Sequence, residues 1–309
     1  MKRARFALIA AAFLLVGCWK IAAAETPGSQ AKTIGDKASQ EAQSSSANYV
    51  GDETCMTCHS DVAKNAIIPH AKTAFTHSAG QSCESCHGPG KAHVDSGGDP
   101  TKIFRFTTAS EKQVNATCLQ CHAAIHPNFA HSDHAKAGLS CIDCHSTHRF
   151  KDEENHLKVS QPQLCETCHA DVKMAFAQAF HHKVPEGLVK CTDCHDPHGS
   201  FQSPQLRSTA DQNAICTKCH METAGPFVYE HPVVKTEGCV SCHSPHGSPN
   251  PRLLKVSNVN TLCLQCHSAS MNFTTPGTPS FHNQTAQYQA CIVCHTQIHG
   301  SNASDIFFK

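Results

Sequence analysis

Twenty cysteines and ten histidines of this chain belong to one repeated motif, Cys-x-x-Cys-His. Two thiols three positions apart can add across the two vinyl groups of one haem, and the adjacent histidine then lies under the iron. Ten copies therefore predict ten covalently attached haems c. The motif residues are Cys55, Cys58, His59; Cys83, Cys86, His87; Cys118, Cys121, His122; Cys141, Cys144, His145; Cys165, Cys168, His169; Cys191, Cys194, His195; Cys216, Cys219, His220; Cys239, Cys242, His243; Cys263, Cys266, His267; and Cys291, Cys294, His295.

Two other uses of cysteine fit the repeated motif less well. Zinc ribbons also pair Cys-x-x-Cys units, but they do not need a histidine after every second cysteine. A disulfide scaffold would not repeat one tripeptide spacing ten times. Only Cys18 lies outside the motifs.

The second axial ligand of each iron should also be histidine. Methionine is the usual alternative, but Met56, Met174, Met221 and Met271 recur at no fixed offset from the motifs. Fifteen of the 25 histidines lie outside the motifs, which is more than ten irons need. Bis-histidine ligation is the prediction.

Position in the chain sorts the candidate distal histidines into two series of five. One series follows the even-numbered motifs, and the other precedes them. Three alternatives stay open: His182 or His181, His134 or His131, and His70 or His77. The spare histidines are His77, His126, His131, His156 and His181. The predicted distal ligands are His70, His93, His134, His148, His182, His198, His231, His246, His282 and His299.

The reach of the chain adds a constraint on His148, His198 and His246, each three residues after a motif histidine. Two imidazoles on opposite haem faces hold their Cα atoms roughly 13 Å apart, allowing about 2 Å for each metal–nitrogen bond. Three residues span at most ~11 Å. Each of these histidines must therefore ligate the iron of a neighbouring haem.

The elements that position these residues should be short. Aromatic residues make up 6% of the chain and apolar residues 39%, so haems must fill most of the interior. The motifs recur in pairs about every 50 residues, which predicts stacked two-haem units. We expect an elongated multihaem cytochrome c of short α-helices and loops with little or no β-sheet. A short helix is expected at 171–180 and an extended piece at 103–106.

The predicted organisation begins with an export signal at residues 1–24, which has a basic start and an apolar segment too short to span a membrane. Two cleavage sites stay open: a lipobox ending at Cys18, which would anchor the chain by lipid, and the small residues before Glu25. Three segments follow this signal: a flexible tether at 25–50, a decahaem domain of five two-haem units at 51–302, and a tail at 303–309.

Several segments resemble the MtrA/DmsE family of periplasmic decahaem cytochromes over about residues 49–302. They are Cys83-Glu-Ser-Cys-His-Gly-Pro, Cys191-Thr-Asp-Cys-His-Asp-Pro-His-Gly-Ser, Gly225-Pro-Phe-Val-Tyr-Glu-His231, Cys239-Val-Ser-Cys-His-Ser-Pro-His-Gly-Ser and Cys291-Ile-Val-Cys-His-Thr-Gln-Ile-His-Gly-Ser-Asn. The resemblance implies a periplasmic haem wire associated with the outer membrane and threaded into a β-barrel porin. Its donor would be a periplasmic or quinol-linked cytochrome, and its acceptor a surface multihaem cytochrome or a terminal reductase. Some relatives carry electrons inward from ferrous iron.

The sequence favours an electron carrier over an enzyme, because ten complete motifs and enough histidines leave no obvious open iron. A free periplasmic shuttle is one alternative. A multihaem reductase of nitrite or sulfur oxyanions is another, although such enzymes often carry an altered motif and none is present. Lys plus Arg equals Asp plus Glu at 25 each, with no basic stripe, so no nucleic-acid partner is expected.

Overall fold

A computed structural model describes residues 47–63, 70–71, 80–152, 154–207, 211–267 and 291–308. The predicted signal at 1–24, most of the tether, Cys18, His77, Met271 and His282 lie outside these described residues.

The described elements are short, and most are one or two helical turns. The longest is helix α7, with 12 residues, which begins at a Ser110–Gln113 capping box. The helices are α2 (Asp52–Met56), α3 (Ser60–Ala63), α5 (Ser82–His87), α6 (Lys91–Asp95), α7 (Glu111–His122), α8 (Asp133–Lys136), α9 (Cys141–Cys144), α10 (Gln163–Glu166), α11 (Ala170–Phe176), α12 (Cys191–Cys194), α13 (Ala214–Thr217), α14 (Pro232–Thr236) and α15 (Val259–His267). The 3-10 turns are η1 (Pro100–Lys102), η2 (Phe129–His131), η3 (Met221–Thr223), η4 (Cys239–Ser241), η5 (Pro251–Leu253) and η7 (Cys291–Val293).

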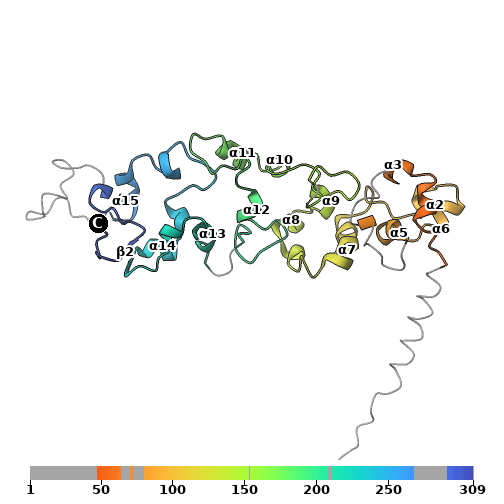
Figure 1. The fold of residues 1–309 in the computed structure, drawn as a ribbon, viewed down its shortest axis with the longest axis horizontal. Coiled ribbons are helices and arrows are strands. Elements are labelled where there is room, and N and C mark those ends of the chain that lie inside the picture. Colours follow the sequence, from red (N-terminus) through yellow and green to blue (C-terminus); the bar gives the residue numbers. More distant parts are fainter. Residues whose placement is uncertain are drawn as a thin grey trace, which may run out of the picture.

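The molecule is elongated, and its elements run broadly in chain order along the long axis, with local reversals such as α9 between α7 and α8 (Figure 1). Helices α2, α5 and α6 lie at one end, and α15 lies near the other. Strands β1 (Tyr229–Glu230) and β2 (Gly300–Ser301) pair antiparallel in the one two-stranded sheet of the described residues. The prediction of short helices with little sheet is therefore confirmed.

Few apolar side chains are buried, as the composition predicts. In the described part of the chain the buried hydrophobic residues are Val114, Phe129, Leu157, Phe176 and Val184. A chain of this length normally buries a large apolar core. The interior of this polypeptide therefore has room for bound groups in place of apolar side chains. Among the same residues no helix combines the length and apolarity needed to cross a membrane.

Two local expectations need correction. The helix expected at 171–180 ends at Phe176, because Phe180 pairs instead with Ser248 in an antiparallel bridge. The piece expected to be extended at 103–106 is extended at Ile103 (φ −143°, ψ 151°) but turns at Phe106 and pairs in no strand. Phe104 donates its backbone N–H to His87 and its carbonyl faces the His87 ring, so it lines a motif instead of a sheet.

Glycine follows three of the predicted distal histidines at points where the chain packs against an earlier segment. A Cβ atom at Gly199, Gly247 or Gly300 would meet the carbonyl oxygen of Asn128, the carbonyl oxygen of Ala175 or the ring of Phe227, respectively. Each contact joins segments from different haem-binding motifs. These glycines therefore allow successive units to approach closely.

Gly247→Ala should lower the free energy of unfolding by about 3 kcal/mol, near the upper end of the cost of overpacking. The added methyl group would meet the backbone carbonyl of Ala175 in α11, which cannot rotate away as a side chain could. Gly187→Ala is the matched control, because a Cβ atom at Gly187 would meet open space. This substitution should cost only the strain of an alanine in a left-handed backbone (φ 78°), about 1 kcal/mol. Guanidinium unfolding of the haem-loaded protein would measure both. A loss at 247 no larger than at 187 would contradict the packing argument.

Candidate haem-binding sites

The odd- and even-numbered motifs have different local structures. The helices of the odd motifs begin before the first cysteine, as in α7 and α15. Helices α9 and α12 instead begin at the first cysteine of an even motif and end before its histidine. His145 and His195 are then extended, with ψ of 156° and 149°. The histidines of the fourth and sixth motifs therefore lie just outside the helix. The second motif differs, because α5 begins before Cys83 and includes His87.

Each odd motif lies against the next even motif through their first cysteines. Thiol hydrogen bonds or contacts join Cys55 with Cys83, Cys118 with Cys141, Cys165 with Cys191, Cys216 with Cys239, and Cys263 with Cys291. The hydrogen bond from Cys165 lowers the pKa of Cys191 to about 7, whereas burial and Asp52 raise the pKa of Cys83 to about 12. Each odd-numbered motif is thus paired with the even-numbered motif that follows it, which gives five pairs.

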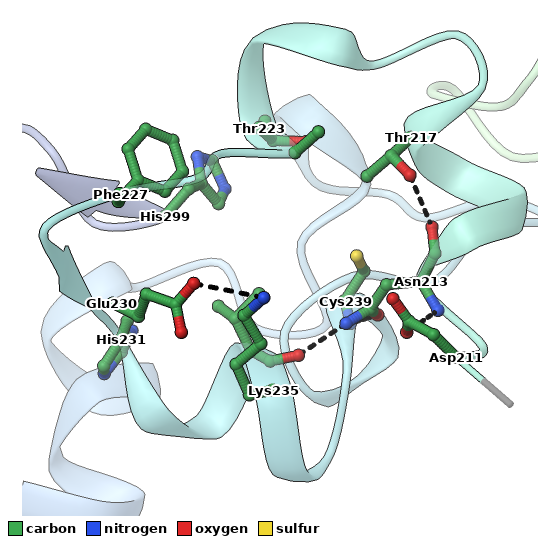
Figure 2. Close-up of a pocket in the computed structure, with 12 residues that line it drawn as sticks. Asp211, Asn213, Thr217, Thr223, Phe227, Glu230, His231, Lys235, Cys239 and His299 are labelled. Carbon is green, nitrogen blue, oxygen red and sulfur yellow. Dashed lines mark hydrogen bonds and ion pairs between the residues drawn. The ribbon is translucent and has the colours of Figure 1, made fainter.

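A polar side chain ahead of each odd motif fastens this pair. Asn115, Asn213 and Asn260 accept the backbone N–H of Cys141, Cys239 and Cys291 at 2.9, 2.9 and 2.8 Å. Asp52 accepts the N–H of Cys83 at 2.9 Å, and Gln161 accepts that of Thr192 at 3.2 Å. Asn213 also donates to the carbonyl of Val234 at 2.6 Å, and it lines the same hollow as Cys239 and His299 (Figure 2).

We did not expect these fastening residues from the sequence, although a signal is present there. Asparagine or aspartate stands three residues before the first cysteine of four odd motifs: Asp52, Asn115, Asn213 and Asn260. The fifth motif has proline at that position, and Gln161 takes over from one residue earlier.

Nine motif histidines face a predicted distal histidine. Two imidazoles bound to one iron have ring centres about 6 Å apart, given about 2 Å per metal–nitrogen bond. The observed centroid distances lie between 5.9 and 6.3 Å. The pairs are His59–His93, His87–His148, His122–His70, His145–His198, His169–His134, His195–His246, His220–His182, His243–His299 and His267–His231.

The pairing follows the reach argument. His148, His198 and His246 each face the histidine of the preceding even motif, at 6.3, 5.9 and 6.0 Å, and not that of their own motif. Within the described residues no imidazole faces His295 at this spacing, and the remaining predicted distal ligand, His282, lies outside them.

Burial prepares the distal rings for a metal. Burial lowers the pKa of His198 to about 4, with the nearby charge of His126 acting in the same direction. The imidazole is therefore neutral at pH 7, and its nitrogen lone pair is available to iron. Burial also lowers the pKa of His70, His148, His231, His246 and His299.

Local hydrogen bonds distinguish His182 from its neighbour His181. His181 uses both ring nitrogens, with Nδ1 at 2.8 Å from the carbonyl of Gln178 and Nε2 at 3.2 Å from the carboxylate of Glu186. His182 places Nδ1 at 2.6 Å from the carbonyl of Pro245, and its ring faces His220. His182 is thus oriented toward a motif and His181 is not.

Other spare histidines lie beside the facing pairs. His131 is exposed, and its ring faces no motif histidine in the described residues. His126 lies 3.8 Å from the His198 ring, and His156 stacks on Phe150 at 4.4 Å. His126 also lies 6.3 Å from His122, but one turn of chain joins these two residues, too short a span to bracket a haem.

The donor set fits haem c. Each motif supplies two thiols and an imidazole, and nine motifs have a second imidazole at the distance that a bis-histidine iron requires. No three- or four-ligand cluster of His, Cys, Asp or Glu suited to a bare metal ion occurs in the described part. The residues are thus arranged for a planar group held between two rings.

Comparison with known proteins agrees with this chemistry. The family model "Doubled CXXCH motif" matches residues 131–174, 181–225 and 231–272, and the model "Cytochrome c554 and c-prime" matches residues 18–88. The multiheme cytochrome MtrA of Shewanella baltica is 33% identical over 272 residues, covering 82% of this chain and 79% of that protein. The C-type polyheme cytochrome OmcC of Geobacter sulfurreducens is 27% identical over 221 residues, covering 55% of this chain and 26% of that protein.

Repeated haem-binding motifs on a scaffold of short helices define a multihaem c-type cytochrome, a class that transfers electrons. The chain belongs to the MtrA family of these cytochromes.

Asn213→Ala should lower the free energy of unfolding by about 2 kcal/mol, because the buried Asn213 side chain no longer satisfies the part-buried N–H of Cys239 and carbonyl of Val234. Asn155→Ala is the control at an exposed side chain, with an expected change within about 0.5 kcal/mol. Guanidinium unfolding would measure both values. Equal losses would show that Asn213 does not fasten the seventh motif to the eighth.

Proposed function

We propose that this chain is a decahaem electron carrier in which each motif holds one haem c between two histidines. The observation that carries the proposal is the set of nine facing imidazole pairs along an elongated molecule (Figure 1). By elimination we propose that His282, the predicted distal ligand outside the described residues, serves the tenth motif with His295. Haem c supplies reversible one-electron chemistry when bound.

The protein residues hold this array in order. The cysteines would attach each haem by thioether bonds, and the motif histidine together with its facing distal histidine would hold the iron and leave no site for a substrate. The paired first cysteines would hold the two haems of a unit close together, which favours electron transfer over chemistry at any one haem.

The chain is proposed to act in the periplasm, associated with the outer membrane through a porin–cytochrome complex. An outer-membrane β-barrel porin would surround it. A periplasmic or quinol-linked cytochrome and a surface multihaem cytochrome or terminal reductase would exchange electrons with its two ends. The elongated shape supports this role, since a rod separates the donor end from the acceptor end (Figure 1). Extracellular metal or dimethyl sulfoxide respiration, and iron oxidation in reverse, all fit such a conduit.

Two measurements on the purified haem-loaded protein test the carrier proposal. A pyridine haemochrome assay should give ten haems per chain, and electron paramagnetic resonance of the oxidised protein should give low-spin ferric signals alone. A count well below ten contradicts the decahaem array. A stoichiometric high-spin signal instead indicates an open iron and favours a multihaem reductase.

Purification from outer membranes tests the conduit proposal separately. A β-barrel protein should co-purify in a stoichiometric complex with the chain. Recovery as a free periplasmic monomer would identify a shuttle and overturn the conduit, while leaving the haem count and spin state unchanged.

His182→Ala should convert one low-spin haem to high-spin, because His182 faces His220 and no other imidazole among the described residues does so. His181→Ala is the matched control and should leave the spectrum unchanged, since both nitrogens of His181 are bonded elsewhere. Electron paramagnetic resonance spin counting measures both. A high-spin signal in the His181 variant alone would reverse the assignment.

A further inference from the structure

All five even-motif histidines place Nδ1 against a backbone carbonyl further along the chain. A carbonyl can only accept a hydrogen bond, so the ring nitrogen donates. The bonds are His87 to Phe104 at 2.9 Å, His145 to Asn155 at 2.7 Å, His195 to Pro204 at 3.0 Å, His243 to Arg252 at 2.8 Å and His295 to Ile306 at 2.6 Å. The described contacts of the odd-motif histidines His59, His122 and His169 include no such bond.

The residue after the accepting carbonyl has a left-handed backbone in four of these five cases. The residues are His156, Gln205, Leu253 and Phe307, with φ of 54°, 57°, 58° and 61°. Glycine occupies none of the four positions. A non-glycine residue in this conformation costs roughly 1–2 kcal/mol, so its recurrence at one structural position calls for a compensating contact.

The left-handed conformation points two successive backbone carbonyls toward the motif: that of the left-handed residue and that of the residue before it. In an extended strand successive carbonyls point in opposite directions. Here the carbonyl of Pro204 faces the His195 ring, and that of Gln205 accepts the N–H of Asp196 at 2.8 Å. Two residues later, Arg207 donates its N–H to the carbonyl of Cys194 at 2.8 Å. The chain is thus held against both sides of the motif.

The same arrangement recurs at the other motifs. The carbonyls of His156 and Leu253 accept the N–H of Ser146 and Ser244 at 2.9 and 2.7 Å. Leu157, Leu206 and Leu254 then bridge to His145, His195 and His243. We name residues 155–158, 204–207, 252–255 and 306–307 the straps.

We infer that the left-handed residues His156, Gln205, Leu253 and Phe307 are positioning residues that lower the reduction potential of the haem held by the same motif. Each turns the preceding carbonyl onto Nδ1 of the motif histidine. The bond reserves Nε2 for iron and makes the imidazole a stronger electron donor, which stabilises the ferric state. This inference rests on the proposed haem ligation by the motif histidines.

Gln205 gives the clearest test, because its side-chain oxygen accepts no hydrogen bond in the described structure. Gln205→Ile strongly disfavours a left-handed backbone, since the residue is β-branched. Gln205→Gly is the matched control, because glycine keeps that conformation without strain. Spectroelectrochemical titration of the haem-loaded protein follows the haem absorbance, and electron paramagnetic resonance checks that every haem stays low-spin.

In Gln205→Ile, about one part in ten of the absorbance change should move to higher potential, since one of ten motifs is altered. Gln205→Gly should titrate like the unaltered protein. Identical curves for both variants, with all haems low-spin, would overturn the inference. If Gln205→Ile loses haem or fails to fold, Gln205→Val at lower expression temperature and Leu253→Ile at the eighth motif supply the same comparison. Failure of the proposed ligation would be visible already in the unaltered protein, as a low haem count or a high-spin signal.

Discussion

The architecture depends on the distance between facing imidazole rings, which is the distance that a shared iron would require. That distance, about 6 Å between ring centres, separates the two backbones by more than three residues can span. A distal histidine placed three residues after a motif must therefore reach the neighbouring unit. His148, His198 and His246 each do so by facing the previous even motif. The axial bonds proposed here would thus tie each unit to the next, and a linear array follows from this requirement.

The polypeptide contributes little apolar core of its own. Five hydrophobic side chains are buried in the described residues, and polar contacts set most of the local geometry. Asn115, Asn213 and Asn260 fasten an odd motif to the following even motif. Gly199 and Gly247 allow the next unit to approach through backbone contacts. The fold therefore specifies distances between motifs, and the haems would supply the burial that a core normally provides.

The sequence predicted the chemistry well because ligand chemistry leaves few alternatives. The motif spacing indicated haem attachment, and the two histidine series selected candidate distal ligands without saying which motif each would face. Local geometry was harder to predict. Whether Phe180 would continue a helix or pair with Ser248 depends on a segment almost 70 residues away. The left-handed backbone of Gln205 has no signal in its residue type, because glutamine has no preference for that conformation. The choice between His181 and His182 depends on Glu186 and Pro245, whose positions only the folded chain defines.

Hydrogen bonds also connect the distal ligands of neighbouring haem positions. His134 and His182 place Nδ1 at 3.0 and 2.6 Å from the carbonyls of Pro197 and Pro245. The next residues, His198 and His246, are themselves distal rings that face the fourth and sixth motifs. A ring that turns toward its motif histidine therefore also fixes the peptide that holds a neighbouring ring. Because each such bond crosses between units, the axial sites of consecutive haems should form together, and the intact array should be more ordered than any isolated two-haem unit.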